Sequence, residues 1–182
     1  EYRPASMNDV CCAVRKILEF LCLYGCTVAV ETVSYKAAPT RRVIHSALNR
    51  EELEAILDVP DRDTPMGKRD YAVLLLASFT GLRAIDIANL RFENYQPEQK
   101  TIHLLQHKTG NLIGLPVPAE VVEAIEDYTQ NGRPDVDSDY IFLTIDRPHR
   151  KLSDKTSIKN ILIRQLKRSS IGYSPGTGRG FH

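Results

Sequence analysis

Three separate stretches of the sequence carry side chains that could act on a phosphate group. The first runs from Thr80 to Leu90, and in it Arg83 follows a glycine at the start of a predicted helix. An arginine beside a helix N-terminus can grip two anionic oxygens, because its planar donors add to the backbone amides. Asp86, one turn later, could hold that guanidinium in place. An ordinary exposed arginine paired with Asp86 would give the same local pattern.

The second and third stretches are weaker signals on their own. Lys108 lies in Gln106–Gly110, near the tip of a predicted hairpin, where a lysine can act as a point charge or a proton donor. His182 follows a glycine-rich run that would let the backbone approach a reacting phosphate closely, and histidine is an acid or base near neutral pH. A lysine that only aids solubility and a stray histidine are the alternative interpretations.

Helical and strand periodicity predict the elements that must position these residues. Asn49 followed by Glu52 is the pattern of a capping box and predicts a helix start. We expect the apolar run Leu74–Leu76 to lie at the domain centre. The predicted elements are helices over Asp9–Gly25, from Asn49, over Lys68–Phe79, Leu82–Leu90 and Pro118–Tyr128, a basic helix from Ser153, a hairpin over Thr101–Leu105 and Leu112–Val117, and a β segment over Tyr140–Leu143.

Composition limits the class of protein further. The 182 residues suffice for one domain with a real core plus a small appendage, and no apolar run reaches the roughly 20 residues that span a bilayer. With no basic and apolar leader at the start, we expect an intracellular protein. The cysteines all fall within the first 26 residues, lack a zinc-ligand pattern, and are interpreted as small buried apolar residues.

Charge is distributed unevenly along the chain. The formal net charge is +1, but from Arg147 to His182 there are nine basic residues against the single acid Asp154. A segment of this kind attracts phosphate backbones through counterion release. A solvated basic helix face is the other interpretation of the same charges.

Together the three stretches are far more specific than any one of them. Thr-Gly-Leu-Arg-x-x-Asp at 80–86, Lys-Thr-Gly at 108–110 and a glycine-rich approach to Phe181–His182 resemble, in that order, the catalytic domain of the tyrosine recombinase (phage integrase) family. Asn-Arg-Glu-Glu-Leu at 49–53 is also similar to the family's entry helix. In the family, the first box carries an arginine, the hairpin a lysine, and the second box reads His-x-x-Arg.

The resemblance implies a fold class and a domain organisation. We expect an α+β, mainly helical catalytic domain with a small β-hairpin or sheet, preceded by the last helix of a core-binding domain. Residues 1–33 would hold that helix, 34–46 a linker, and 47–182 the catalytic domain, incomplete at its C-terminus.

The resemblance also implies roles for individual residues. Arg83, Lys108 and His182 would be catalytic, with Asp86 as the supporting acid of Arg83, and no metal or other cofactor is implied. The predicted DNA-binding residues are Arg41, Arg42, Lys155, Lys159, Lys167 and Arg179. The expected reaction cuts and rejoins DNA through a 3′-phosphotyrosine intermediate. The family's nucleophilic tyrosine would lie beyond His182, and Tyr173 precedes that histidine, so this chain by itself is predicted to be inactive.

The expected partner is double-stranded DNA with a specific recombination site. The resemblance implies a homo-tetramer on DNA for the full-length protein, no membrane, and a cytoplasmic, nucleoid-associated location. Two alternatives remain open. One is a non-catalytic DNA-binding module of the same fold, and the other is a helical interaction domain whose basic segment is incidental.

Overall fold

The computed structural model describes residues 4–27, 48–153 and 157–171, and the chain divides into two compact units, Glu1–Ile44 and His45–His182. The predicted linker over 34–46 lies outside the described residues. The division between the units falls within that predicted linker. The identification of the first unit as part of a core-binding domain stays a prediction.

The described part of the first unit is one helix and its C-terminal turn. Helix α1 spans Pro4–Leu23, so it begins earlier than the predicted start at Asp9. The predicted stop is confirmed, because Gly25 adopts a left-handed φ of 79° and its amide donates to the Cys22 carbonyl over 3.1 Å. With no second element of this unit described, its apolar side chains are exposed, as with Ile17 at 59%.

The prediction that the cysteines are buried is wrong for this unit as described. Cys12, Cys22 and Cys26 are exposed, Cys11 is partly exposed, and none of the four forms a disulfide. A single helix has no opposite face against which small apolar side chains can be buried. The sequence pattern therefore identified an amphipathic helix correctly but could not supply the surface that would cover it.

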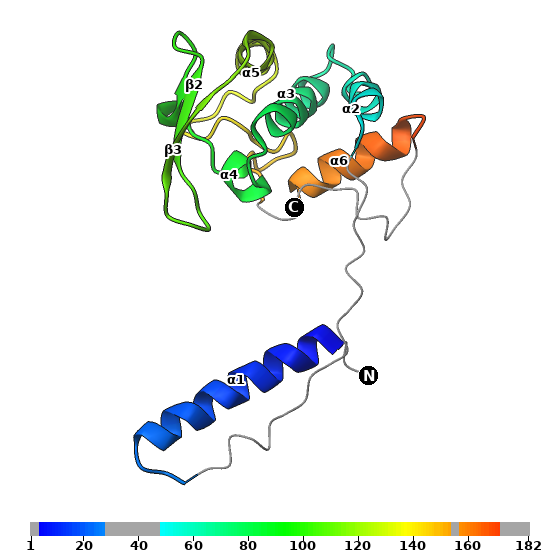
Figure 1. Cartoon of the computed structure of the whole chain (residues 1–182). Helices are drawn as coiled ribbons and strands as arrows, with labels where there is room; N and C mark the ends of the chain where they lie inside the picture. Colours follow the sequence, from blue (N-terminus) through cyan, green and yellow to red (C-terminus); the bar gives the residue numbers. More distant parts are fainter. Residues whose placement is uncertain (1–3, 28–47, 154–156, 172–182) are drawn as a thin grey trace. The chain divides into compact units, whose positions relative to one another are not determined.

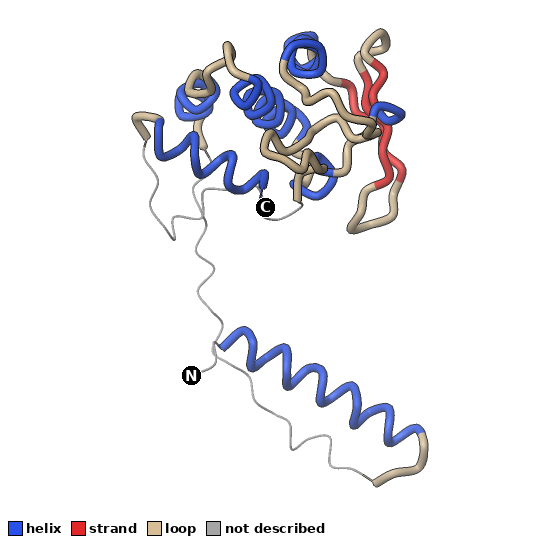
Figure 2. The backbone as a smooth tube through the Cα atoms, turned by 180° about the vertical axis from the view of Figure 1, so that it is seen from behind, coloured by secondary structure: helices blue, strands red, loops and turns tan. Residues whose placement is uncertain are grey.

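The second unit contains the other described helices and a small antiparallel sheet (Figure 1). The sheet has the order β1-β2-β3 and lies at one edge of the domain, with α4 and α5 beside it, as the reverse view in Figure 2 also shows. The elements are α2 (Arg50–Leu57), α3 (Pro65–Thr80), α4 (Ala84–Ala88), the 3-10 turn η2 (Phe92–Asn94), β1 (Tyr95–Gln96), β2 (Thr101–Leu105), β3 (Leu112–Pro116), α5 (Ala119–Asn131) and α6 (Ser157–Arg168). The predicted mainly helical α+β fold is confirmed.

Local capping explains where the first two helices of this unit begin. The predicted capping box is present, since the Glu52 amide donates to Asn49 Oδ1 over 2.7 Å and the Asn49 amide donates to Glu52 Oε2 over 3.1 Å. Helix α3 starts at Pro65, three residues before the predicted start. Proline suits a first helical position because its missing N–H would have no partner there, and the Thr64 side chain caps the Gly67 amide.

Helix α3 forms the centre of the domain. It is apolar on nearly every side, as a helix surrounded by other elements must be. Leu74, Leu75 and Leu76 are at most 3% exposed, which confirms their predicted place in the core. Around α3 pack α2, α4, α5 and α6, so among the described elements this helix directly contacts both α4, which follows Arg83, and α6, which carries Lys159 and Lys167.

Two predicted elements differ from the structure, and the start of a third falls next to residues outside the described part. The helix after the glycine bend is only the five residues of α4, because Leu90 and Arg91 already turn toward the sheet. The segment Tyr140–Leu143 is not a strand of the sheet but makes the isolated bridges Arg91 to Tyr140 and Leu143 to Lys151. Ser153 directly precedes residues 154–156, which are outside the described part, and the described helix α6 begins at Ser157.

Candidate active site

Arg83 lies at the bend between α3 and α4. The bend is possible because Gly81 has a φ of 61°, a left-handed conformation that costs glycine little, and its amide still donates to the Ala77 carbonyl over 3.0 Å. Leu82 is buried and anchors the turn. Arg83 is then the N-cap residue of α4, with its carbonyl accepting from the Asp86 amide and its side chain partly exposed. The backbone thus places a guanidinium at a helix N-terminus, as predicted from the sequence.

Lys108 lies in the turn of the β2–β3 hairpin. The two strands pair antiparallel from Thr101 opposite Pro116 to Leu105 opposite Leu112, which confirms the predicted hairpin. The turn is closed by the Gln106 amide donating to the Asn111 carbonyl over 2.9 Å, and Gly110 takes a φ of 67° within it. Lys108 itself is exposed, so its ammonium group is available to a ligand.

Asp86 connects these two places. Its carboxylate is 5% exposed, and Oδ1 accepts the backbone N–H of His107 over 2.9 Å. The sequence predicted that Asp86 would hold the Arg83 guanidinium, but these two described side chains form no hydrogen bond or ion pair with each other. Oδ2 of Asp86 is buried and has no hydrogen-bond partner within the described part of the chain. The carboxylate therefore fastens the hairpin to α4 and retains one unfilled acceptor.

This contact joins the two segments that bear Arg83 and Lys108. Asp86 follows Arg83 by three residues, about 4.5 Å along a helix axis, and His107 directly precedes Lys108. Residues separated by more than 20 positions in sequence thus share one hydrogen-bonded junction, which Figure 1 shows as α4 beside the hairpin. His182, the third predicted catalytic residue, lies outside the described residues, and so does Tyr173.

The other end of α4 is held as well, by a residue that sequence reasoning assigned only to a basic segment. Lys151 donates from Nζ to Oδ1 of Asn89, the C-cap residue of α4, over 2.6 Å. The same ammonium lies 5.3 Å from the centroid of the Tyr140 ring, a cation–π distance. Lys151 therefore links the C-terminal end of α4 to the segment that contains Tyr140.

The predicted DNA-binding residues are only partly within the described chain. Arg41, Arg42, Lys155 and Arg179 lie outside it. Lys159 and Lys167 are both exposed on α6, whose opposite face is buried through Ile158, Ile161, Leu162 and Leu166. Helix α6 is thus amphipathic, with a basic outer face that also carries Arg168.

Sequence reasoning missed a buried ionic cluster between α3 and α6. Asp70 is 1% exposed, and its carboxylate accepts from Arg69, from Arg164 and, over 2.9 Å, from Gln165 Nε2. Arg69 also donates to the Leu143 carbonyl over 3.1 Å. The signal was available, since a charged Arg-Asp pair inside a strongly apolar helix has to be compensated. The cluster holds the basic helix against the core and so orients its outer face.

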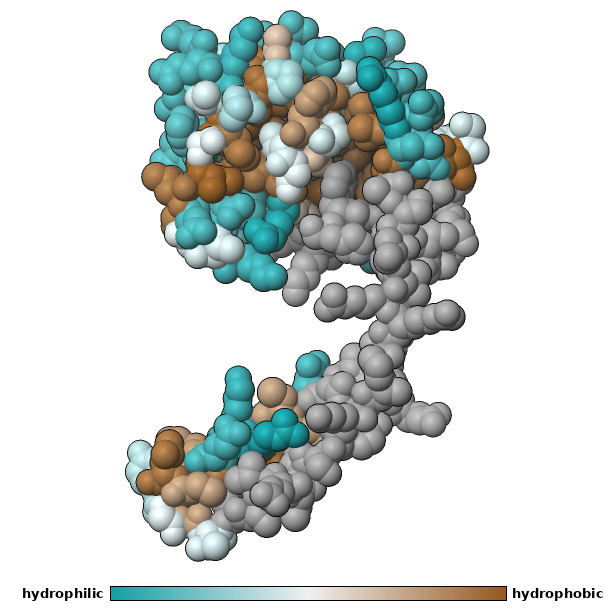
Figure 3. Space-filling model, in the orientation of Figure 1, coloured by the Kyte–Doolittle hydropathy of each residue, from teal (hydrophilic) through white to brown (hydrophobic). Residues whose placement is uncertain are grey.

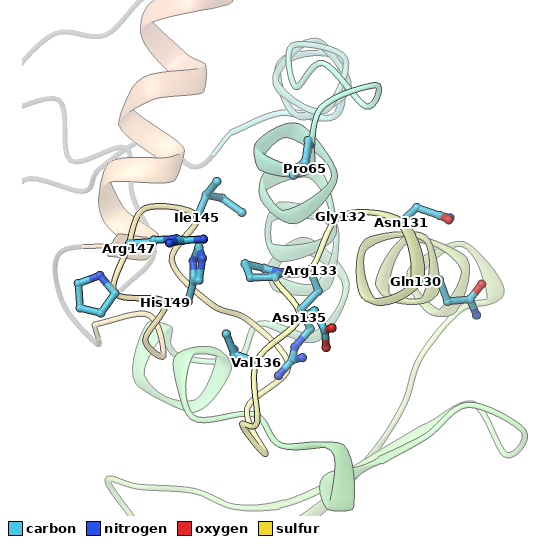
Figure 4. Close-up of a pocket in the computed structure, with 12 residues that line it drawn as sticks. Pro65, Gln130, Asn131, Gly132, Arg133, Asp135, Val136, Ile145, Arg147 and His149 are labelled. Carbon is cyan, nitrogen blue, oxygen red and sulfur yellow. The ribbon is translucent and has the colours of Figure 1, made fainter.

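One pocket among the described residues lies elsewhere and contains none of the predicted site residues. Its volume is about 1030 Å³, and Figure 4 shows Arg147 and His149 on one side of it, with Arg133 and Asp135 facing them. Pro65 also lines it, which puts the pocket at the start of α3, whereas Arg83 follows the end of that helix. The pocket and the residues selected by the sequence motifs therefore lie in different parts of the domain.

Two further properties bear on the class of protein. Within residues 4–27, 48–153 and 157–171, His, Cys, Asp and Glu form no group of three that could hold a metal ion. Of the helices in these same ranges, none has both the length and the apolar character that crossing a membrane requires.

The fold and the site define the class. The structure resembles a lambda integrase chain from a tetramer bound to a Holliday junction, with a TM-score of 0.71 at 18% identity over 98% of this chain and 51% of that one. The model of the phage integrase family matches residues 46–175. The chain belongs to the phage integrase family, and its second unit has the fold of the tyrosine recombinase catalytic domain.

Individual relatives agree with this assignment. The y4gC protein of Sinorhizobium fredii, an integrase/recombinase by name, is 36% identical over 138 residues, which cover 75% of this chain and 69% of that protein. The tyrosine recombinase XerD of Vibrio cholerae is 30% identical over 135 residues, which cover 72% of this chain and 43% of XerD. The chain thus spans less than half the length of this XerD and about half of the lambda integrase chain.

Proposed function

We propose that this chain is the catalytic domain of a site-specific DNA recombinase that cuts and rejoins strands through a 3′-phosphotyrosine intermediate. The observation that carries the proposal is the Asp86 to His107 hydrogen bond, which joins the helix start bearing Arg83 to the turn bearing Lys108. Two cations held at one junction are suited to a phosphodiester, whose transition state gains negative charge on its oxygens.

Each residue then has a distinct role in phosphoryl transfer. Arg83 holds two oxygens of the scissile phosphate, as a planar guanidinium does well. Lys108, on an exposed turn, protonates the leaving 5′ oxygen. His182, as the first residue of the second box, would add a further donor. Asp86 positions the lysine turn relative to Arg83 and is a positioning residue rather than a catalytic one.

The nucleophile in this proposal is a tyrosine that follows the second box. The expectation that this chain by itself binds DNA without cleaving it belongs to the same proposal. A tyrosine nucleophile divides strand exchange into two steps and keeps the bond energy in a covalent protein–DNA link. Assembly as a tetramer on two DNA sites and association with the nucleoid belong to the same proposal for the full-length protein.

DNA is held through its phosphates by the basic face of α6, where Lys159 and Lys167 are exposed. Because phosphate contacts release counterions, the affinity must fall steeply as salt rises. Lys155, Arg41, Arg42 and Arg179 are proposed to add to this footprint. The lambda integrase structures with DNA support a DNA partner by fold, since they are solved as DNA complexes.

The decisive experiment compares cleavage with binding in the full-length protein. Arg83→Ala should abolish the covalent protein–DNA adduct on a nicked substrate while sparing most of the DNA affinity, because one phosphate contact among many is lost. If affinity and rate fall together, Arg83 is only a binding residue. If the wild-type protein binds DNA but never forms an adduct, the fold serves as a non-catalytic DNA-binding module. Binding that is absent or independent of salt would favour the interaction domain.

A further inference from the structure

The outer face of the β2–β3 hairpin carries two exposed leucines beside the turn that holds Lys108. Leu105 and Leu112 are register partners, and they are 65% and 76% exposed. The inner face of the same hairpin is packed, with Ile102 fully buried and Leu104 6% exposed. The sheet therefore does not need Leu105 and Leu112 for its core, and their exposure costs free energy that a bound partner could recover.

The outer face continues along the strands beyond the two leucines. His103 and Gly114 are the next register pair along the strands, and a Cβ on Gly114 would lie 3.0 Å from atoms of the His103 ring. The imidazole thus lies across the neighbouring strand in the space that a side chain at 114 would occupy. Figure 3 shows hydrophobic surface at the edge of the domain where Figure 1 places the sheet. The two exposed leucines therefore form an apolar patch at the end of this face that is next to the turn.

The charge of the hairpin indicates which partner this is. No Asp or Glu occurs between Glu98 and Glu120, although the chain holds 23 acidic residues. The same stretch carries Lys100 and Lys108. A ribbon without carboxylates and with a cation at its exposed turn is complementary to a polyanion. A protein partner, whose surface carries both signs of charge, would find no acidic residue on this hairpin to pair with its basic groups.

We propose that Leu105 and Leu112 form an apolar contact with the deoxyribose faces of DNA on either side of the phosphate that Lys108 reaches. The inference rests on the proposed function, since it takes Lys108 to lie at that phosphate. Sugars are the apolar part of the backbone next to each phosphate, and the two leucines flank the turn Gln106–Asn111 on both strands of the hairpin. The contact fixes how deeply the hairpin approaches the duplex, and with it the reach of Lys108.

The test measures affinity of this chain for a fluorescein-labelled duplex of about 30 base pairs at several salt concentrations. The double variant Leu105→Gln/Leu112→Gln should bind about tenfold more weakly at every salt concentration, a difference of about 1.4 kcal/mol. The slope of log affinity against log salt should not change, because no phosphate contact is removed. Lys108→Gln should behave oppositely and lower the slope by about one.

Matched controls keep the result interpretable. Met66 is an exposed apolar residue on α3, 37% exposed and outside the hairpin, so Met66→Gln should change the affinity less than about twofold. If the glutamine variant melts at a lower temperature than the parent, Leu105→Thr/Leu112→Thr, which keeps strand propensity, replaces it. The melting temperature itself should be nearly unchanged, because both leucines are exposed.

The outcomes separate this inference from the proposed function. If the parent chain binds DNA with a steep salt dependence and the double variant binds equally well, the leucine contact does not exist while the recombinase account stands. If the parent chain shows no salt-dependent DNA binding, the proposed function itself fails. A parent chain that dimerises, with loss of the dimer but not of DNA affinity in the double variant, would show that the leucines cover a second copy and would overturn the inference.

Discussion

Two buried carboxylates, Asp70 and Asp86, do different work in this domain. Asp70 is 1% exposed and receives donors from three side chains on α3 and α6. Asp86 is 5% exposed and receives one backbone amide, and its second oxygen has no partner within the described residues. A fully compensated carboxylate holds two helices together, whereas a partly compensated one retains capacity to bind a further donor. The two acids differ in their partners, because Asp70 binds side chains of two packed helices whereas Asp86 binds the backbone of a hairpin turn that is distant in sequence.

The largest expected effect is the removal of the satisfied acid. Asp70→Ala should lower the free energy of unfolding by about 3 kcal/mol or more, because Arg69 and the partly buried Arg164 lose the charge that compensates them. Urea unfolding followed by circular dichroism measures this. The matched control is Asp127→Ala, which breaks the more exposed pair with Lys68 and should cost about 1 kcal/mol or less. Equal losses in the two variants would mean that burial does not distinguish them.

Asp86→Asn should have a smaller effect on stability and a larger one on chemistry. The amide oxygen of asparagine can still accept the His107 N–H, so we expect a loss of about 1 kcal/mol or less in the free energy of unfolding. In the full-length protein, adduct formation should fall by about tenfold or more, because a neutral amide holds the turn that bears Lys108 less firmly than a carboxylate does and places an NH2 donor where Oδ2 was. Asp86→Ala should lose both stability and rate. If the Asp86→Asn protein cleaves DNA at the parent rate, Asp86 contributes to stability alone and the prediction is wrong.

The sequence predicted the parts of the site whose signals are local. The glycine bend before Arg83, the hairpin turn at Lys108 and the capping box at Asn49 each follow from short-range chemistry that a few adjacent residues specify. The contact between Asp86 and His107 was not predicted, because the obvious local partner of Asp86 was Arg83, three residues away. Which donor a buried carboxylate accepts is decided by packing between elements far apart in the sequence.

Other misses have the same origin. The strand β1 is only two residues long and has no periodicity to detect. The segment at Tyr140–Leu143 has the apolar character of a strand but makes only two isolated bridges, one to Arg91 and one to Lys151. Helix α1 was predicted correctly, but the burial of its cysteines was not, because burial needs a neighbouring surface that the helix pattern does not specify. Tertiary neighbours decide these features, and periodicity carries no information about them.

The smallest expected effect concerns the sheet at high pH. Partial burial raises the pKa of Tyr95 to about 12, from an ordinary value of about 10. The contribution of its neutral form to stability is fully present below pH 10 and is lost as the pH rises through 12, because the unfolded chain releases the proton first. Tyr95→Phe should therefore reduce the decline in the free energy of unfolding between pH 10 and 12. An identical decline in both proteins would show that Tyr95 does not contribute to it.

The central claim is that Arg83 and Lys108 act on one phosphate because Asp86 joins their segments. A crystal structure of the full-length protein bound to a duplex that carries its recombination site tests this most directly. The account predicts that the Arg83 guanidinium and Lys108 Nζ both lie within about 3.2 Å of oxygens of the same phosphodiester, with the Asp86 to His107 bond retained. Side chains that contact two different phosphates, or a hairpin turned away from the scissile strand, would contradict it.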